Sequence, residues 1–196
     1  YVFQAKDDAG QSDAGANASG YPSFALNPEE GLGRLEFSSD SADFFSEDGT
    51  VGIGASGRLR GVVLHDILSE VIVPEDLDSA VEASFAAGSI GSEDRDSILS
   101  MLKERVESAS RLGWFPADRS KVFTESSVIN VDGEVYRPDR VIVDGKKVIV
   151  VDYKFGKEEK KYLRQIGNYA RLYKSMGYPD VEAYLWYVEN DKVVRG

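Results

Sequence analysis

The sequence predicts a protein of the mixed α/β (α+β) class, with secondary structure in the order helix, three strands, helix, strand. Three observations predict it. Apolar residues recur at helical spacing over 59–73, the pattern becomes extended from Lys121, and a long helical segment returns before a last strand. With 196 residues, 42% of them hydrophobic, the chain can build one sizeable core, so we expect one main domain.

Helices dominate the region before Lys121. The first is expected over 59–73, where one face is apolar and Pro74 follows as a stop signal. Two further helices are expected over 75–87 and 93–109, and Ser92 is the predicted N-cap of the second. Both carry acidic outer faces.

The strands are predicted from two Asp-Gly dipeptides between apolar runs, which are the strongest short hairpin signal. Asp132-Gly133 and Asp144-Gly145 are expected to join three antiparallel strands over 121–131, 134–143 and 146–154. A helix over about 157–176 and a strand over 181–189 complete the order.

The composition limits the chemistry. The absence of cysteine excludes disulfides, thiolate catalysis, zinc ribbons and cysteine-ligated iron–sulfur clusters, so a metal would be a hard cation held by oxygen and the single histidine. The net charge is -11, but residues 111–174 hold 14 Lys or Arg against 9 Asp or Glu. This locally basic segment leaves a polyanionic partner open.

Residues 1–57 are expected to form a flexible arm, because they contain 9 Gly and 8 Ser and few apolar runs. A short strand at 34–37 and an anchoring turn at 42–45 are expected within it. The chain begins at Tyr1, so we expect it to be cut from a longer protein. No apolar run long enough to span a membrane and no signal peptide is predicted.

Charged residues converge where the second Asp-Gly hairpin closes. Asp152 and Lys154 lie two apart at the end of a strand of Val and Ile, so both point to one face, and Asp139 comes from the neighbouring strand. Such a cluster suits a magnesium-type ion. Alternatively, Asp139 pairs with Arg140 or Arg137, and Lys154 with a surface acid.

Three further features are candidates for the same site. His65 lies on the first predicted helix, at the edge of the hydrophobic core, and is either a metal ligand or a structural histidine. Glu125 is either a further acid of the site or a surface strand residue. Gln165 and Tyr169 are four residues apart and share a helix face. The basic residues around them, with Tyr162 and Tyr173 as stacking groups, form either a phosphate-binding surface or an ordinary solvated face.

Read in order, the motifs are His65 in GVVLHDILSEV, Asp139 in YRPDRVIVDGK, Asp152 and Lys154 in VIVVDYKFGK, and Gln165 with Tyr169 in LRQIGNYARLY. Over about 57–189 the chain resembles the PD-(D/E)xK nuclease superfamily, specifically the RecB-like C-terminal nuclease domain of UvrD/Rep-type helicase–nucleases such as RecB and AddA. The resemblance implies a restriction-endonuclease-like core, a central mixed sheet flanked by helices, in 58–196. It also implies that 1–57 lead from an upstream helicase part.

The resemblance further implies roles for residues. The divalent ion, Mg²⁺ or Mn²⁺, would be held by His65, Asp139, Asp152 and the backbone carbonyl of Tyr153. Lys154 would orient or help deprotonate the attacking water, and Gln165 and Tyr169 would position the DNA strand or the site's own groups. Candidate accessory residues are Glu125, Arg140, Lys161 and Arg164.

The function implied is a metal-dependent DNA exonuclease domain that acts on single-stranded ends in DNA end processing and recombinational repair, in the bacterial cytoplasm. ATPase and helicase activity would belong to other domains of the parent chain, because this sequence has no phosphate-binding G-x-x-x-x-G-K-[ST] loop. One alternative is a catalytically silent DNA-binding or scaffolding domain. Another alternative is an interaction domain whose acidic helices dock on the helicase domains.

Overall fold

The computed structural model describes residues 53–130 and 133–196. Its α-helices are α2 Ile53–Glu70, α3 Leu77–Ala86, α4 Ser92–Arg111 and α5 Lys160–Ser175. Its strands are β1 Val122–Thr124, β2 Val128–Ile129, β3 Val135–Tyr136, β4 Arg140–Asp144, β5 Lys147–Lys154, β6 Asp180–Tyr187 and β7 Lys192–Arg195. Three 3₁₀ turns lie at Pro74–Asp76, Arg119–Lys121 and Val188–Asn190.

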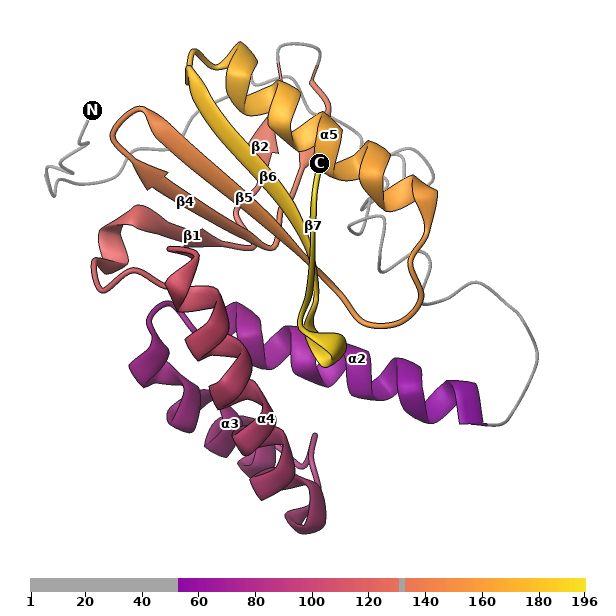
Figure 1. The fold of residues 1–196 in the computed structure, drawn as a ribbon. Coiled ribbons are helices and arrows are strands. Elements are labelled where there is room, and N and C mark those ends of the chain that lie inside the picture. Colours follow the sequence, from indigo (N-terminus) through magenta and orange to yellow (C-terminus); the bar gives the residue numbers. More distant parts are fainter. Residues whose placement is uncertain (1–52, 131–132) are drawn as a thin grey trace, which may run out of the picture. The chain divides into compact units, whose positions relative to one another are not determined.

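A mixed five-stranded sheet forms the centre, in the order β1-β4-β5-β6-β7 (Figure 1). β5 and β6 are parallel, joined by the crossover helix α5, and the other neighbouring pairs are antiparallel. β2 and β3 form a separate antiparallel ribbon. β5 is the central strand, and its Val148–Val151 run is buried because helices cover both sheet faces.

The two sheet faces have separate cores. On one face, α2, α3 and α4 pack against residues such as Ile149, Val151 and Tyr153, with Trp114 and Trp186 fully buried. On the other face, α5 packs its Ile166 and Tyr169 side against Val148, Val150 and Leu185. Figure 1 shows α5 on one side of the sheet and α2 on the other. Alternate residues of β5 therefore face different helices.

The predicted class is confirmed: the described residues form an α+β structure with a mixed sheet. The hairpin at Asp144-Gly145 is also confirmed, with Gly145 at a φ of 61°. The other hairpin pairs β2 with β3, and Gly133 has a φ of 84°, while Asp132 lies outside the described residues.

Several predicted boundaries were wrong. The first helix begins at Ile53, so 53–57 are helical, and it ends at Glu70 before Pro74. Gly91, not Ser92, is the N-cap of α4, and Ser92 is its first residue.

The first two predicted strands, 121–131 and 134–143, are each interrupted. Thr124 and Ile129 end the two short strands of the first segment, and Pro138, which lacks an N–H, separates β3 from β4 in the second. Strand β7 was not predicted.

The strand at 34–37 and the turn at 42–45 lie outside the described residues. Within the described part, none of the helices combines the length and the apolar character that crossing a membrane requires.

Candidate metal centre

The candidate site lies at the edge of the sheet where β4 begins and β5 ends. The antiparallel register pairs Arg140 with Val151, so Asp139 precedes the paired segment beside the end of β5, which carries Asp152. Asp139 and Asp152 are buried, with 5% and 1% of their surfaces exposed. Hydrophobic strands thus carry these carboxylates into a poorly solvated position, where an uncompensated charge is costly.

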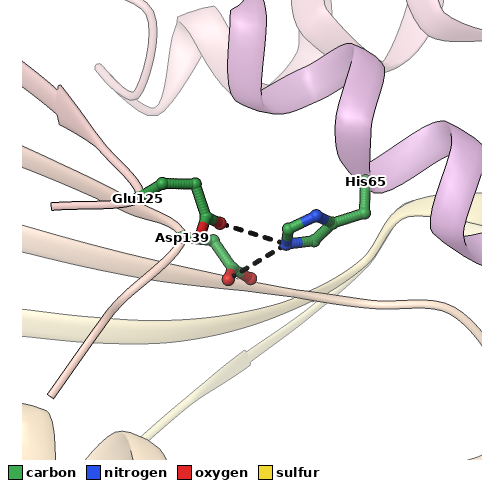
Figure 2. A group of neighbouring side chains, drawn as sticks. All are labelled: His65, Glu125 and Asp139. Carbon is green, nitrogen blue, oxygen red and sulfur yellow. Dashed lines mark hydrogen bonds and ion pairs between the residues drawn. The ribbon is translucent and has the colours of Figure 1, made fainter. Parts of the chain in front are cut away.

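His65 reaches this edge from α2 and meets two carboxylates (Figure 2). Its Nε2 lies 3.2 Å from Asp139 Oδ1 and 3.2 Å from Glu125 Oε1. One potential ligand atom from each of the three residues lies within 4.8 Å of the others. We call His65, Glu125 and Asp139 the acidic triad. Helix α2, β1 and β4 each supply or flank one member.

Glu125 enters the triad through an unusual backbone conformation. It follows β1 with a φ of 49°, a left-handed value that is uncommon for a residue other than glycine. Its N–H donates to the carbonyl of Asp139 over 3.1 Å, and its Oε2 pairs with Arg137 Nε at 2.8 Å. These contacts turn the side chain inward from the end of a strand.

The triad holds a proton strongly when no metal is bound. Burial lowers the pKa of the His65 imidazole, but the hydrogen bonds and charges of Asp139 and Glu125 outweigh burial and raise the pKa from 6.5 to about 11. The imidazolium therefore occupies a position that two carboxylates make favourable for a cation.

Asp139 is fixed from the other side by β5. The backbone N–H of Tyr153 donates to Asp139 Oδ2 over 2.5 Å. Because a charge-assisted hydrogen bond of this kind is short and directional, it holds the carboxylate with Oδ1 toward His65. The structure thus places the Tyr153 main chain beside the triad. That the Tyr153 carbonyl binds the metal stays a prediction.

A second polar group lies on the α5 side of the same edge. Lys154 Nζ is 2.7 Å from Asp152 Oδ2, donates to Gln165 Oε1 over 3.3 Å and lies 4.3 Å from the centre of the Tyr162 ring. Lys154 is buried, with 4% of its surface exposed. We call Asp152, Lys154 and Gln165 the lysine group.

Tyr169 links the lysine group to the segment that leads into Asp139. Gln165 Nε2 donates to the Tyr169 hydroxyl over 3.4 Å, and this hydroxyl donates to the Arg137 carbonyl over 3.4 Å. Arg137 precedes Asp139 by two residues. The helical spacing of Gln165 and Tyr169 therefore connects Lys154 to the triad through α5.

The structure brings together most of the predicted residues in two groups rather than one. His65 and Asp139 meet each other, and Asp152 meets Lys154 and lies outside the triad. Glu125, a candidate accessory residue in the sequence analysis, is a member of the triad. Arg137, which was considered as a partner of Asp139, pairs instead with Glu125.

The predicted surface of α5 is only partly present. Lys161 and Arg164 are exposed, but Tyr173, expected as a stacking group, is 6% exposed and belongs to the core. Tyr162 is half-buried against Lys154. Its position three residues before Gln165 is the signal that could have assigned it to the lysine group.

The donor set suits a small divalent cation. The triad offers one imidazole nitrogen and two carboxylates, and magnesium and manganese bind to such oxygen-rich sets. Within the described residues, the contact of the buried Glu125 Oε1 is with His65 Nε2, at 3.2 Å. A carboxylate oxygen in that state is available to a metal once His65 loses its proton.

No family model matches the chain, and no curated protein matches it.

Proposed function

We propose that the protein is a metal-dependent DNA nuclease domain of the RecB-like PD-(D/E)xK type. The observation that carries the proposal is the acidic triad, His65 with Glu125 and Asp139, at the sheet edge where the buried Asp152–Lys154 pair also lies. A buried cluster of carboxylates with a histidine, beside a fixed ammonium, matches the chemistry of phosphodiester hydrolysis.

The triad would hold Mg²⁺ or Mn²⁺, with Asp152 and the Tyr153 carbonyl as further ligands by resemblance. The bound ion would neutralise charge on the scissile phosphate and lower the pKa of a bound water. Tyr153 N–H keeps the Asp139 carboxylate oriented. Lys154 contributes positive charge near the position where negative charge develops, and Asp152, Gln165 and the Tyr162 ring hold its ammonium in place.

The exposed face of α5 supports a nucleic-acid substrate. Its basic side chains and those just before it are exposed: Lys157, Lys160, Lys161, Arg164, Arg171 and Lys174. This face lies on the helix that also carries Gln165. Lys and Arg bind the phosphate backbone in a salt-dependent manner, so the proposal includes weak DNA binding that decreases with salt.

The order of elements also supports the proposal. Helix α2, strands β1, β4 and β5, helix α5 and strand β6 follow one another along the chain, with α3, α4, β2 and β3 between them. This succession supports the proposed restriction-endonuclease-like core. By the same resemblance, we propose exonuclease action on single-stranded ends delivered by helicase domains of a longer parent chain, in recombinational repair in the bacterial cytoplasm.

One observation favours a second candidate, a DNA-binding or scaffolding domain without catalysis. Asp152 is paired with Lys154 at 2.7 Å and is not part of the triad. A protein that kept this pair closed would bind metal or DNA without cleaving it.

The test is cleavage of a fluorescent single-stranded DNA with Mg²⁺ or Mn²⁺ by the wild type, Asp139→Asn and Asp144→Asn. Asp144 is the matched control because it is an aspartate at the far end of β4, the strand that follows Asp139, and it is exposed, in an ion pair with Lys121. We expect cleavage by the wild type and the control and none by Asp139→Asn. Binding of DNA by the wild type with no cleavage would favour the second candidate, and equal cleavage by all three would contradict a site at Asp139.

A further inference from the structure

Arg140 is fully buried immediately beside the acidic triad, yet no carboxylate of the described residues forms an ion pair with it. Its exposed fraction is 0%, and it follows Asp139 in the chain. In the part of the chain that the structure describes, its guanidinium contacts carbonyl and phenol oxygens and an aromatic ring. A buried cation costs free energy unless its donors are satisfied, so these contacts determine what Arg140 does.

On one side, Arg140 holds the end of helix α2. Its Nη2 donates to the carbonyl of Val71, and its Nη1 donates to the carbonyl of Ile72 over 3.3 Å. These two residues follow directly after Glu70, the last residue of α2. Carbonyls at a helix C-terminus lack helical partners and carry partial negative charge, so a guanidinium stabilises them. The helix that carries His65 is thereby fixed to β4.

On the other side, Arg140 holds strand β5 and the chain after α4. Its Nε donates to the Tyr153 hydroxyl over 2.7 Å, and its Nη1 donates to the Trp114 carbonyl over 3.1 Å. The ring of Phe115 lies 3.9 Å from the guanidinium carbon. Tyr153 is also the residue whose N–H donates to Asp139. One side chain thus connects the supports of His65 and of Asp139.

We propose that Arg140 is a positioning residue that sets the distance between His65 on α2 and Asp139 before β4. Its planar fork of five donors can bridge helix, strand and loop at the same time, which a lysine ammonium cannot do. This inference rests on the proposed metal site, because the separation of His65 and Asp139 matters most if both bind one ion.

The experiment compares Arg140→Met and Arg140→Lys with a matched control, Arg105→Met. Arg105 also fixes a segment through carbonyls, those of Val188 at 2.9 Å and Glu189 at 3.2 Å, but it is not among the contacts of the triad. Mn²⁺ affinity is measured calorimetrically on folded protein. We expect affinity at least tenfold weaker in Arg140→Met, an intermediate loss in Arg140→Lys, and a change under twofold in Arg105→Met.

A second readout does not depend on metal binding. His65 is the single histidine of the chain, so its imidazole signals in a proton NMR spectrum need no assignment. At fixed pH without metal, we expect these signals to shift in both Arg140 variants and to stay unchanged in Arg105→Met. A folded Arg140→Met with wild-type Mn²⁺ affinity and an unshifted His65 signal would overturn the proposal.

If both Arg140 variants fail to fold, Tyr153→Phe decides the question. It keeps the ring that contacts His65 at 6.1 Å between centroids and removes only the hydroxyl that Arg140 Nε binds. We expect a shifted His65 signal and Mn²⁺ affinity three- to fivefold weaker; an unshifted signal would overturn the proposal. A wild type that binds no Mn²⁺ would refute the proposed function, and the NMR signals would then test the role of Arg140 separately.

Discussion

The acidic triad and the lysine group lie at the same sheet edge but differ in how their charges are balanced. In the triad, one imidazole faces two carboxylates, and it stays protonated because both favour the cation. In the lysine group, the contacts of the ammonium with described residues are to the Asp152 carboxylate, the Gln165 amide oxygen and the Tyr162 ring. The three residues of the triad therefore carry one more negative than positive charge, which Arg137 offsets through its ion pair with Glu125. On the proposed function the triad would exchange its proton for a metal, whereas the lysine group would keep its cation.

The comparison teaches how one strand can serve two chemistries. Successive side chains of β5 point to opposite faces, so the Tyr153 ring faces α2 while Asp152 and Lys154 face α5. The backbone N–H of Tyr153 also holds Asp139.

The largest effect is expected from removing the ammonium. Lys154→Met leaves Asp152 buried beside an apolar chain, so we expect the free energy of unfolding to decrease by about 3–5 kcal/mol and cleavage to slow by about 100-fold or more. Mn²⁺ affinity should stay within a few fold, because Lys154 is outside the triad. Urea unfolding, calorimetry and cleavage rates measure the three quantities.

The control for this prediction is the double variant Asp152→Asn with Lys154→Met, which removes both charges of the pair. Its stability should exceed that of Lys154→Met alone. A Lys154→Met protein as stable as the wild type would show that the pair is not buried as described.

The next effect is the pH dependence of metal binding. With the pKa of His65 raised to about 11, the metal must displace one proton at neutral pH, so affinity should rise about tenfold per pH unit between pH 6 and 9. Calorimetry in buffers of different ionisation enthalpy counts the released proton. An affinity that does not change with pH would contradict metal binding at His65.

Stability without metal should depend on pH in the opposite direction. The pKa of His65 is higher in the folded protein than in the unfolded chain, so its contribution is fully present below pH 6.5 and is lost as pH rises toward about 11. From pH 6 to 9 the wild type should lose more stability than His65→Gln. If urea unfolding showed the same change in the free energy of unfolding from pH 6 to 9 for both proteins, the raised pKa of His65 would be refuted.

The smallest effect is expected from Tyr169→Phe, which removes the hydroxyl between Gln165 and the Arg137 carbonyl. A neutral hydrogen bond contributes about 1 kcal/mol, so the cleavage rate should decrease about fivefold with metal affinity unchanged. Equal losses of rate and metal affinity would place Tyr169 in the support of the triad instead.

Local signals in the sequence were enough to predict the central hairpin and two pairs of side chains at the site. The Val148–Val151 run and Asp144-Gly145 predicted the central hairpin, and residue alternation put Asp152 and Lys154 on one face. The helical spacing of Gln165 and Tyr169 predicted their shared face. Each of these inferences depends on neighbours within a few residues.

What the sequence could not predict depends on tertiary contacts. Glu125 joins the triad through a left-handed backbone that its N–H to Asp139 stabilises, and no local propensity indicates this. Arg140 follows Asp139 and was considered as its partner, but burial of its side chain against α2 and Tyr153 turns it away. β7 was missed because a short strand at the sheet edge carries little hydrophobic pattern.

On the proposed function, the acidic triad binds a divalent cation through His65. The most direct measurement is pulsed electron paramagnetic resonance of Mn²⁺ added to the protein, because the single histidine makes any imidazole ¹⁴N coupling to the metal attributable to His65. We expect this coupling in the wild type and its loss in His65→Gln. Bound Mn²⁺ without imidazole coupling, or no bound Mn²⁺ at all, would refute metal binding at His65.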